Sequence, residues 1–267
     1  MIRLAPLLLL AAVSGTSPAL AQDSSRDLCA NRPGRGSPPC ILDVGRFQVE
    51  TSLVDFTHDK QPGSVVDTSL FADLAFRLGI SKTSELQLAW SPYVGVKTRD
   101  LSGVSRVSGY SDVTLAYRQS LANPDGSGFS IAVQPYVSAP VGRKGIGAGA
   151  WQGGLAVPIS IALPSGFALG LTPQAAVVRN QAHDGAHLNW TGVIGVSHPI
   201  GPYSLGAELY ANRDDDPAGG TTRATFDLFT AWTPPWAPDT QFDVGLNAGL
   251  NRQTPVYEAY LGIARRF

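Results

Sequence analysis

The sequence has few of the residues on which enzymes and nucleic-acid-binding proteins depend. Charged residues make up 15% of the chain, the formal net charge is -1, and there are only four histidines and two cysteines. This near-neutral balance provides no field that would attract a polyanion, so we expect no nucleic-acid partner. The few histidines and cysteines leave little material for a catalytic or metal-binding cluster.

The chain also lacks a long apolar run beyond its amino terminus. Arg3 precedes an apolar stretch over residues 7–13 and a small-residue site at 19–21. This arrangement is typical of a cleaved secretory signal, so we predict a signal peptide over residues 1–21. No later run approaches the roughly 18 apolar residues that a spanning helix needs. Export without such a helix leaves the periplasm, the outer membrane or the medium as destinations.

The two cysteines, Cys29 and Cys40, stand in a segment rich in Pro, Gly and Arg that precedes the first predicted strand. In an oxidising periplasm, two cysteines this close in a short segment are expected to form a disulfide. A metal site or a redox pair is the alternative, but nothing nearby supplies further ligands. We predict that residues 22–44 form a periplasmic amino-terminal segment closed by this disulfide.

From residue 45 onward, apolar and polar residues alternate in segments separated by stretches rich in turn residues, which is typical of β-strands. In the first segment, for example, Phe47 and Val49 alternate with Gln48 and Glu50. The predicted strands cover residues 46–56, 69–78, 85–97, 112–121, 129–137, 151–163, 167–178, 188–200, 203–212, 223–233, 241–251 and 256–267. Twelve is an even number, as bacterial single-chain barrels require.

The polar face of these strands carries too many charges for a dry core, which argues against a soluble sandwich or a lipocalin-like barrel. An aqueous lumen would tolerate them. We therefore predict an all-β fold over residues 45–267, a twelve-stranded antiparallel transmembrane β-barrel in the outer membrane of a Gram-negative bacterium. Short turns (79–82, 122–128, 164–166, 201–202 and 234–239) are assigned to the periplasmic side, and long loops (57–67, 98–109, 139–150, 179–187 and 212–222) to the outside.

The last predicted strand ends the chain on an aromatic residue, Phe267. A terminal strand of this kind resembles the segment by which outer-membrane barrels are recognised for assembly. We therefore expect Phe267 to serve as an assembly signal for the barrel assembly machinery. The same strand would pair with the first one and so remove both edges of the sheet.

Several stretches together resemble a known family. They are GRFQVETSLVDFTHD from residue 45, GYSDVTLAYR from residue 109, VQPYVSAPVG from residue 133, GGLAVPISIALPSGF from residue 153, and the closing YLGIARRF. They are similar to the outer-membrane transporter family labelled MetA-pathway of phenol degradation, over nearly the whole mature chain. The resemblance implies a barrel with a transport role for small solutes, including aromatic ones, and it supplies no site residues and no cofactor.

Inward residues near the periplasmic ends of adjacent strands alternate in sign: Asp243, Arg266, Glu50, Arg77, Glu85 and Arg118. We predict an ion-pair network there, because opposite charges on neighbouring strands can satisfy one another. The opposite wall is neutral, with Gln134, Tyr136, Gln152, Gln174 and Asn189, and is the candidate solute path. A wall of mixed sign favours neutral or zwitterionic solutes over simple ions.

Three other functions are alternatives to this porin-like channel. The first is a structural or interaction barrel with a closed lumen, acting through its loops or lipid contacts. The second is an outer-membrane hydrolase, for which the chain offers no G-x-S-x-G motif and no inward histidine beside a strand serine. The third is metal binding by His183 and His187, or by the acidic run 214–216, both of which are better explained as solvated loops.

Basic residues gather in the predicted outer loops. They are Lys60, Lys97, Arg99, Arg106, Arg143, Lys144, Arg179, Arg213, Arg223 and Arg252. Such residues would find anionic partners among outer-membrane lipid and lipopolysaccharide. Simple loop solubility explains the same composition.

Overall fold

The computed structural model describes residues 26–267, so the predicted signal peptide lies outside the described residues. Most of the described chain is strand. The strands are β1 (Phe47–Gln61), β2 (Ser64–Ser81), β3 (Ser84–Trp90), β4 (Tyr93–Asp100), β5 (Gly103–Gly109), β6 (Val113–Ala122), β7 (Phe129–Ala139), β8 (Gln152–Ala156), β9 (Ile159–Ala162), β10 (Ala168–Arg179), β11 (Ala186–Ile200), β12 (Tyr203–Asp214), β13 (Thr221–Trp232), β14 (Thr240–Gly249) and β15 (Tyr257–Arg266). One 3₁₀ turn, Pro164–Gly166, precedes β10.

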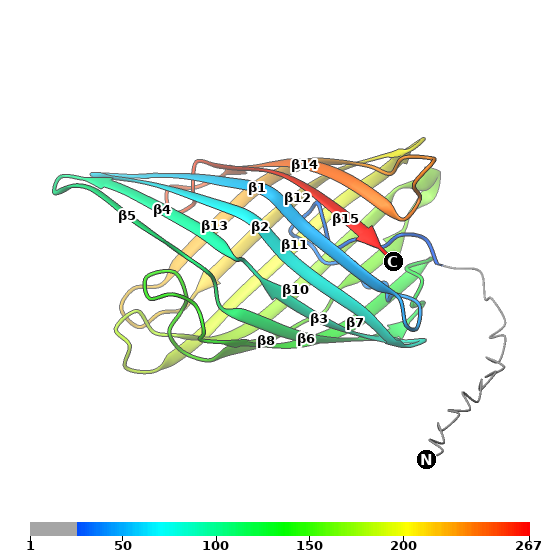
Figure 1. The fold of residues 1–267 in the computed structure, drawn as a ribbon, viewed down its shortest axis with the longest axis horizontal. Helices are drawn as coiled ribbons and strands as arrows, with labels where there is room; N and C mark the ends of the chain where they lie inside the picture. Colours follow the sequence, from blue (N-terminus) through cyan, green and yellow to red (C-terminus); the bar gives the residue numbers. More distant parts are fainter. Residues whose placement is uncertain (1–25) are drawn as a thin grey trace, which may run out of the picture.

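The strands close into one antiparallel barrel, because β1 pairs with β2 on one side and with β15 on the other (Figure 1). Three wall strands are each split in two by a short break, namely β3 with β4, β5 with β6, and β8 with β9. Counting each split strand once gives twelve strands, which confirms the predicted fold. No helix within residues 26–267 is long and apolar enough to cross a membrane.

Alternation along each strand puts apolar side chains on the outside and small or polar ones inside. On β11, Leu188, Trp190 and Ile194 are exposed, whereas Val193 between them is buried. The inward faces of other strands carry fully buried polar residues such as Gln48 and Arg77. An apolar exterior around a polar interior is the inverse of a soluble protein and suits a wall with lipid outside and water inside.

Both ends of the described chain lie at one end of the barrel, which we call the terminal end (Figure 1). Short connections such as Gly201 and Pro202 lie there, and the opposite end is called the loop end. Two segments predicted as long loops, 57–67 and 98–109, are instead mostly strand. Their residues continue the β1–β2 and β4–β5 ladders, and the first hairpin turns at Pro62 and Gly63, where the glycine has a positive φ of 80°. The prediction ended these strands too early, because polar residues outside the lipid do not stop strand pairing.

The amino-terminal segment was expected to lie outside the barrel, in the periplasm. The structure instead places residues 26–44, which we call the lumenal segment, inside the terminal end of the barrel (Figure 1). Its backbone hydrogen bonds to inward side chains from walls on opposite sides, including Glu85 on β3 and Thr172 on β10. A segment without regular structure can be buried only where its backbone groups find such partners.

Candidate functional site in the barrel lumen

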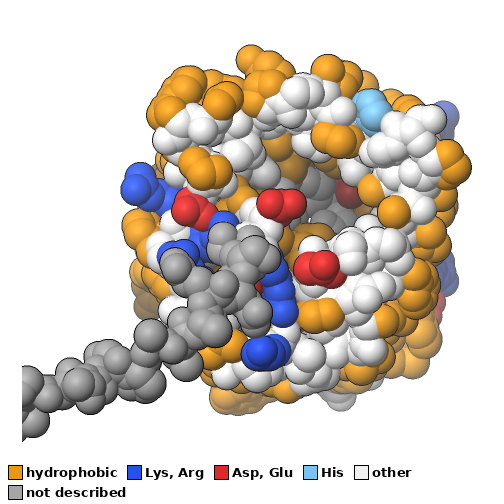
Figure 2. Space-filling model, turned by 90° about the vertical axis from the view of Figure 1, so that its right-hand side faces the viewer, with side chains coloured by type: hydrophobic (Ala, Val, Ile, Leu, Met, Phe, Trp, Pro, Cys, Tyr) orange, Lys and Arg blue, Asp and Glu red, His pale blue; other side chains and the backbone are white. Residues whose placement is uncertain are grey.

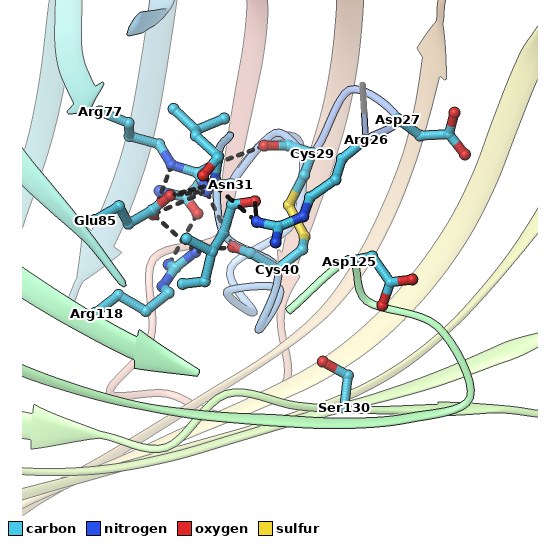
Figure 3. The surroundings of a disulfide bond; sticks show 12 residues. Arg26, Asp27, Cys29, Asn31, Cys40, Arg77, Glu85, Arg118, Asp125 and Ser130 are labelled. Atoms are coloured by element: carbon cyan, nitrogen blue, oxygen red, sulfur yellow. Dashed lines mark hydrogen bonds and ion pairs between the residues drawn. A yellow bond between two sulfur atoms is a disulfide. The ribbon is translucent and has the colours of Figure 1, made fainter. Parts of the chain in front are cut away.

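The lumenal segment is closed on itself by a disulfide between Cys29 and Cys40, whose Cα atoms are 6.3 Å apart. Figure 3 shows this disulfide with the side chains of Arg77, Glu85 and Arg118 pointing toward it from the wall. Arg77 donates hydrogen bonds to the carbonyl oxygens of both cysteines, at 2.5 and 3.2 Å. The barrel wall therefore binds the backbone of the disulfide-closed loop at both cysteines.

Four of the six residues expected to form an ion-pair network meet in one buried cluster. Arg77 lies 2.8 Å from Glu85 and 3.2 Å from Glu50, and Arg118 lies 3.4 Å from Glu85. All four side chains are at most 1% exposed. Asn31 and Arg32 of the lumenal segment donate their backbone N–H groups to Glu50, and Leu42 donates its own to Glu85. The cluster is formally neutral and anchors the segment as well as the wall.

The other two residues of that set have different partners. Asp243 binds the guanidinium of Arg32, with a closest distance of 2.9 Å, and Arg266 binds Asp239. Strand register explains the separation: Arg266 lies opposite Gln48, while Asp243 lies opposite Gly262. The carboxylates and guanidiniums therefore sit at different levels of the wall. Arg32 was missed because its segment was placed outside the barrel.

Two residues of the candidate solute path hydrogen-bond each other, and a third hydrogen-bonds an arginine of the charged cluster. Gln174 donates to the Tyr136 hydroxyl at 2.9 Å, whereas Gln134 accepts from Arg118 at 2.7 Å. Asn189 exchanges hydrogen bonds with Asn212 on the next strand. Gln152 begins β8, in register with Ser138. These residues are partly buried and line the same side of the barrel, but Gln134 is occupied by the arginine.

A second arginine of the lumenal segment, Arg35, reaches the wall formed by β12 to β15. Its guanidinium is salt-bridged to Glu258 and lies 3.5 Å from Asp227. Its backbone N–H donates to Glu208 at 2.7 Å, and its guanidinium carbon lies 4.7 Å from the ring centre of Tyr210. The sequence did not predict any of these residues as part of a site. The alternating pattern does place these acids on the inward face, but nothing in it indicates that a basic segment enters the lumen.

The lumenal segment does not fill the barrel. A cavity of about 390 Å³ remains between it and the wall from β9 to β14, lined by Ser160, Thr172, Ser197, Glu208 and Phe229 among others. Figure 2 looks onto the terminal end and shows a hollow at its centre, with apolar side chains around the outer rim. The cavity surface combines polar groups, such as the hydroxyls of Ser160 and Ser197 and the carboxylate of Glu208, with apolar ones such as Val193 and the ring of Phe229. A small organic molecule could occupy such a space.

At the loop end, His187 hydrogen-bonds Asn180 and Asp214, while His183 lies in the turn before β11 with a φ of 62°. Two backbone N–H groups, from Gln181 and Ala218, hold the pKa of the Asp216 carboxyl below its usual range. Within residues 26–267, no group of three His, Cys, Asp or Glu is arranged to hold a metal ion.

The other two histidines contact acidic or aromatic residues. His58 hydrogen-bonds Asp67, and His198 stacks on Phe167. Across the part of the chain that the structure describes, none of the hydrogen bonds of these histidines goes to a serine. The arrangement that a serine hydrolase needs is not among them.

Solved outer-membrane barrels share this fold. The COG4313 outer membrane channel from Pseudomonas putida F1 superposes with a TM-score of 0.65 at 15% identity, covering 88% of this chain and 99% of that one. The beta domain of the Bordetella autotransporter BrkA gives 0.54 at 12% identity, covering 84% and 100%. No curated relative matches the chain. Residues 30–267, from the lumenal segment to the last strand, match the family described as "Putative MetA-pathway of phenol degradation", and the chain belongs to that family.

Proposed function

We propose that this protein is an outer-membrane channel through which small solutes pass passively or by facilitated diffusion. The observation that supports this most is the interior of the barrel: it is polar, it retains a cavity, and a separate segment narrows it at one end. A barrel that served only as a structural element would have no need of such a hollow. Small solutes, neutral and aromatic ones included, are the class that the cavity size and the neutral wall favour.

The terminal end faces the periplasm in this proposal, because a predicted export signal precedes the described residues and the short turns gather there. The loop end then faces outward. Arg99 is paired with Asp67 and Arg213 with Asp215, so part of the basic charge at that end is already neutralised by the protein. Lipopolysaccharide would be the partner of the basic side chains that remain. Reversing the charge of Arg106 and Arg252 would then raise the sensitivity of cells to detergent and chelators, and unchanged sensitivity would count against this contact.

The alternative is a barrel whose lumen stays shut and that acts through its loops or lipid contacts. The tight anchoring of the lumenal segment favours it, since the segment binds inward residues of β1, β2, β3, β10, β12 and β15. The two functions differ in one measurable property. A channel conducts with the segment in place, whereas a barrel that the segment shuts does not.

The test uses the mature protein refolded into a planar bilayer, with heat-modifiable migration in gels as the check of folding. We expect discrete conductance steps, and larger or more frequent ones in a Cys29→Ser/Cys40→Ser variant, because opening the disulfide ring loosens the segment. Uptake of neutral solutes by loaded liposomes should change in the same direction. Folded, unchanged protein that shows neither conductance nor uptake would remove the channel function and leave the closed barrel, even if the cysteine variant conducts.

A further inference from the structure

We propose that one row of the lumen wall is a binding site for the guanidinium or ammonium group of a small organic cation, and that Arg35 occupies this site as a tethered competitor. This inference rests on the proposed channel function and names a chemical class for one of its solutes. The row consists of Glu208, Asp227, Asn247 and Glu258, which we call the acid row. An organic cation differs from the neutral solutes expected from the sequence. The sequence did not indicate it, because only the folded chain brings these acidic groups together.

The acid row is set by strand register. Glu208 on β12 lies opposite Asp227 on β13, Asp227 opposite Asn247 on β14, and Asn247 opposite Glu258 on β15. Neighbouring strands are about 5 Å apart, so the three carboxylates form a line roughly 15 Å long on one level of the wall. Asp55 on β1 lies beside Glu258 and adds a fourth acid. Carboxylates spaced along a line suit the several donors of an organic cation better than a single metal ion.

Some buried polar atoms of the row have no hydrogen-bond partner within the described chain. Both carboxylate oxygens of Asp227, which is fully buried, lack a hydrogen bond of normal geometry, although the Thr225 hydroxyl lies close enough to interact with this carboxylate. Asn247 Oδ1, whose residue is 2% exposed, also accepts no hydrogen bond. A buried carboxylate without a donor costs free energy unless a ligand or water satisfies it. These atoms gather on β13 and β14, between the carboxylates that Arg35 does reach.

Arg35 fits this site incompletely. It is salt-bridged to Glu258, but its Nε atom is 3.5 Å from Asp227 and makes no hydrogen bond. Arg32, three residues earlier in the segment, differs. It binds Asp243 through two nitrogens at 2.9 and 3.2 Å and Ser52 at 2.6 Å, and neither Arg32 nor Asp243 has an unpartnered buried atom. The Arg32 site is complete and structural. The Arg35 site still has free acceptors. An untethered cation can orient its donors toward them, because no backbone constrains its position.

Two further features match a cation site. The ring of Tyr210 lies against the Arg35 guanidinium, which provides the aromatic face that flat cations favour. Glycines flank Arg35, and a Cβ atom at Gly34 would lie 2.4 Å from Glu208 Oε1. A side chain there would push that carboxylate away from the two backbone N–H groups it accepts, from Arg35 and Gly36. Glu208 also lines the cavity, so a solute there has direct access to the end of the row.

The test measures binding of ethylguanidinium chloride to the refolded protein in detergent by calorimetry. A tethered arginine acts at an effective concentration in the millimolar range or above, so its removal should strengthen apparent binding by about tenfold or more. We expect this gain in Arg35→Ala and in Arg35→Gln, which preserves more of the side-chain volume should the alanine variant fold poorly. Arg46→Ala, at an exposed arginine, is the matched control and should behave like the unchanged protein.

Two additional measurements locate the site. In the Arg35→Ala background, Asp227→Asn should abolish the gain, while Asp239→Asn, at the pair with Arg266, should leave it intact. Ethanesulfonate, an anion of similar size, should not bind. The proposal is overturned if folded Arg35 variants bind ethylguanidinium no better than Arg46→Ala, or if Asp227→Asn leaves binding unchanged. Conductance without such binding would reject the cation site and keep the channel, whereas binding without flux in any variant would keep the site and reject the channel.

Discussion

Removing the Arg77 side chain should destabilise the barrel more than any other single truncation in the lumen. Arg77→Ala deletes hydrogen bonds to two carboxylates, Glu50 and Glu85, and to the carbonyls of Cys29 and Cys40. Hydrogen bonds to charged groups contribute about 1.5–3 kcal/mol each, and removing one partner of a buried ion pair costs about 3–5 kcal/mol. Glu85 keeps Arg118 as a partner, and Glu50 keeps two backbone donors. The expected loss in the free energy of unfolding is therefore about 3–4 kcal/mol.

Equilibrium unfolding in urea of the protein refolded into phospholipid vesicles measures this loss. Arg46→Ala removes an exposed arginine and should change the free energy of unfolding by less than about 0.5 kcal/mol. The double variant Arg77→Ala/Glu50→Gln is the sharper control. It restores a neutral cluster with Glu85 and Arg118 still paired, so it should recover a large part of the loss.

The reasoning is refuted by either of two results. One is an Arg77→Ala loss below about 1 kcal/mol, which would mean that water reaches the cluster and screens its charges. The other is a double variant less stable than Arg77→Ala alone. That result would mean that the hydrogen bonds of Glu50 to the lumenal segment matter more than the unpaired charge.

Three other perturbations follow from the structure. Deleting Phe267, which exchanges backbone hydrogen bonds with the first strand, should lower the yield of heat-modifiable barrel in the membrane, and a normal yield would contradict its role as assembly signal. Gln134→Trp and Gln174→Trp should reduce solute flux through the folded protein in liposome assays, and unchanged flux in both would place the path elsewhere. Arg266→Ala should lower the free energy of unfolding by about 1 kcal/mol, less than Arg77→Ala because its partner Asp239 is 44% exposed, and a loss as large as that of Arg77→Ala would contradict this ranking.

The fold followed from the sequence because lipid and water impose opposite demands on the two faces of a strand. Side chains alternate strictly along a strand, so the pattern assigns residues such as Leu188 and Trp190 to the lipid face and their neighbours to the inward face. The same parity put Glu50, Arg77, Glu85 and Arg118 on the inward face at similar depth. A terminal aromatic strand and an even strand count then required closure. These properties are local and periodic, so the sequence by itself determined them.

The position of residues 26–44 was decided only by tertiary structure. Their Pro, Gly and Arg composition has no period and looks like an extended linker, so nothing local distinguishes a segment outside the barrel from one inside it. What holds it are long-range contacts, such as that of Arg32 with Asp243 and that of Arg35 with Glu258, more than 200 residues apart in sequence. The acid row likewise depends on the register of four strands, which alternation alone does not fix. The sequence determined the wall, and the folded chain decided what narrows the lumen and which charges face it.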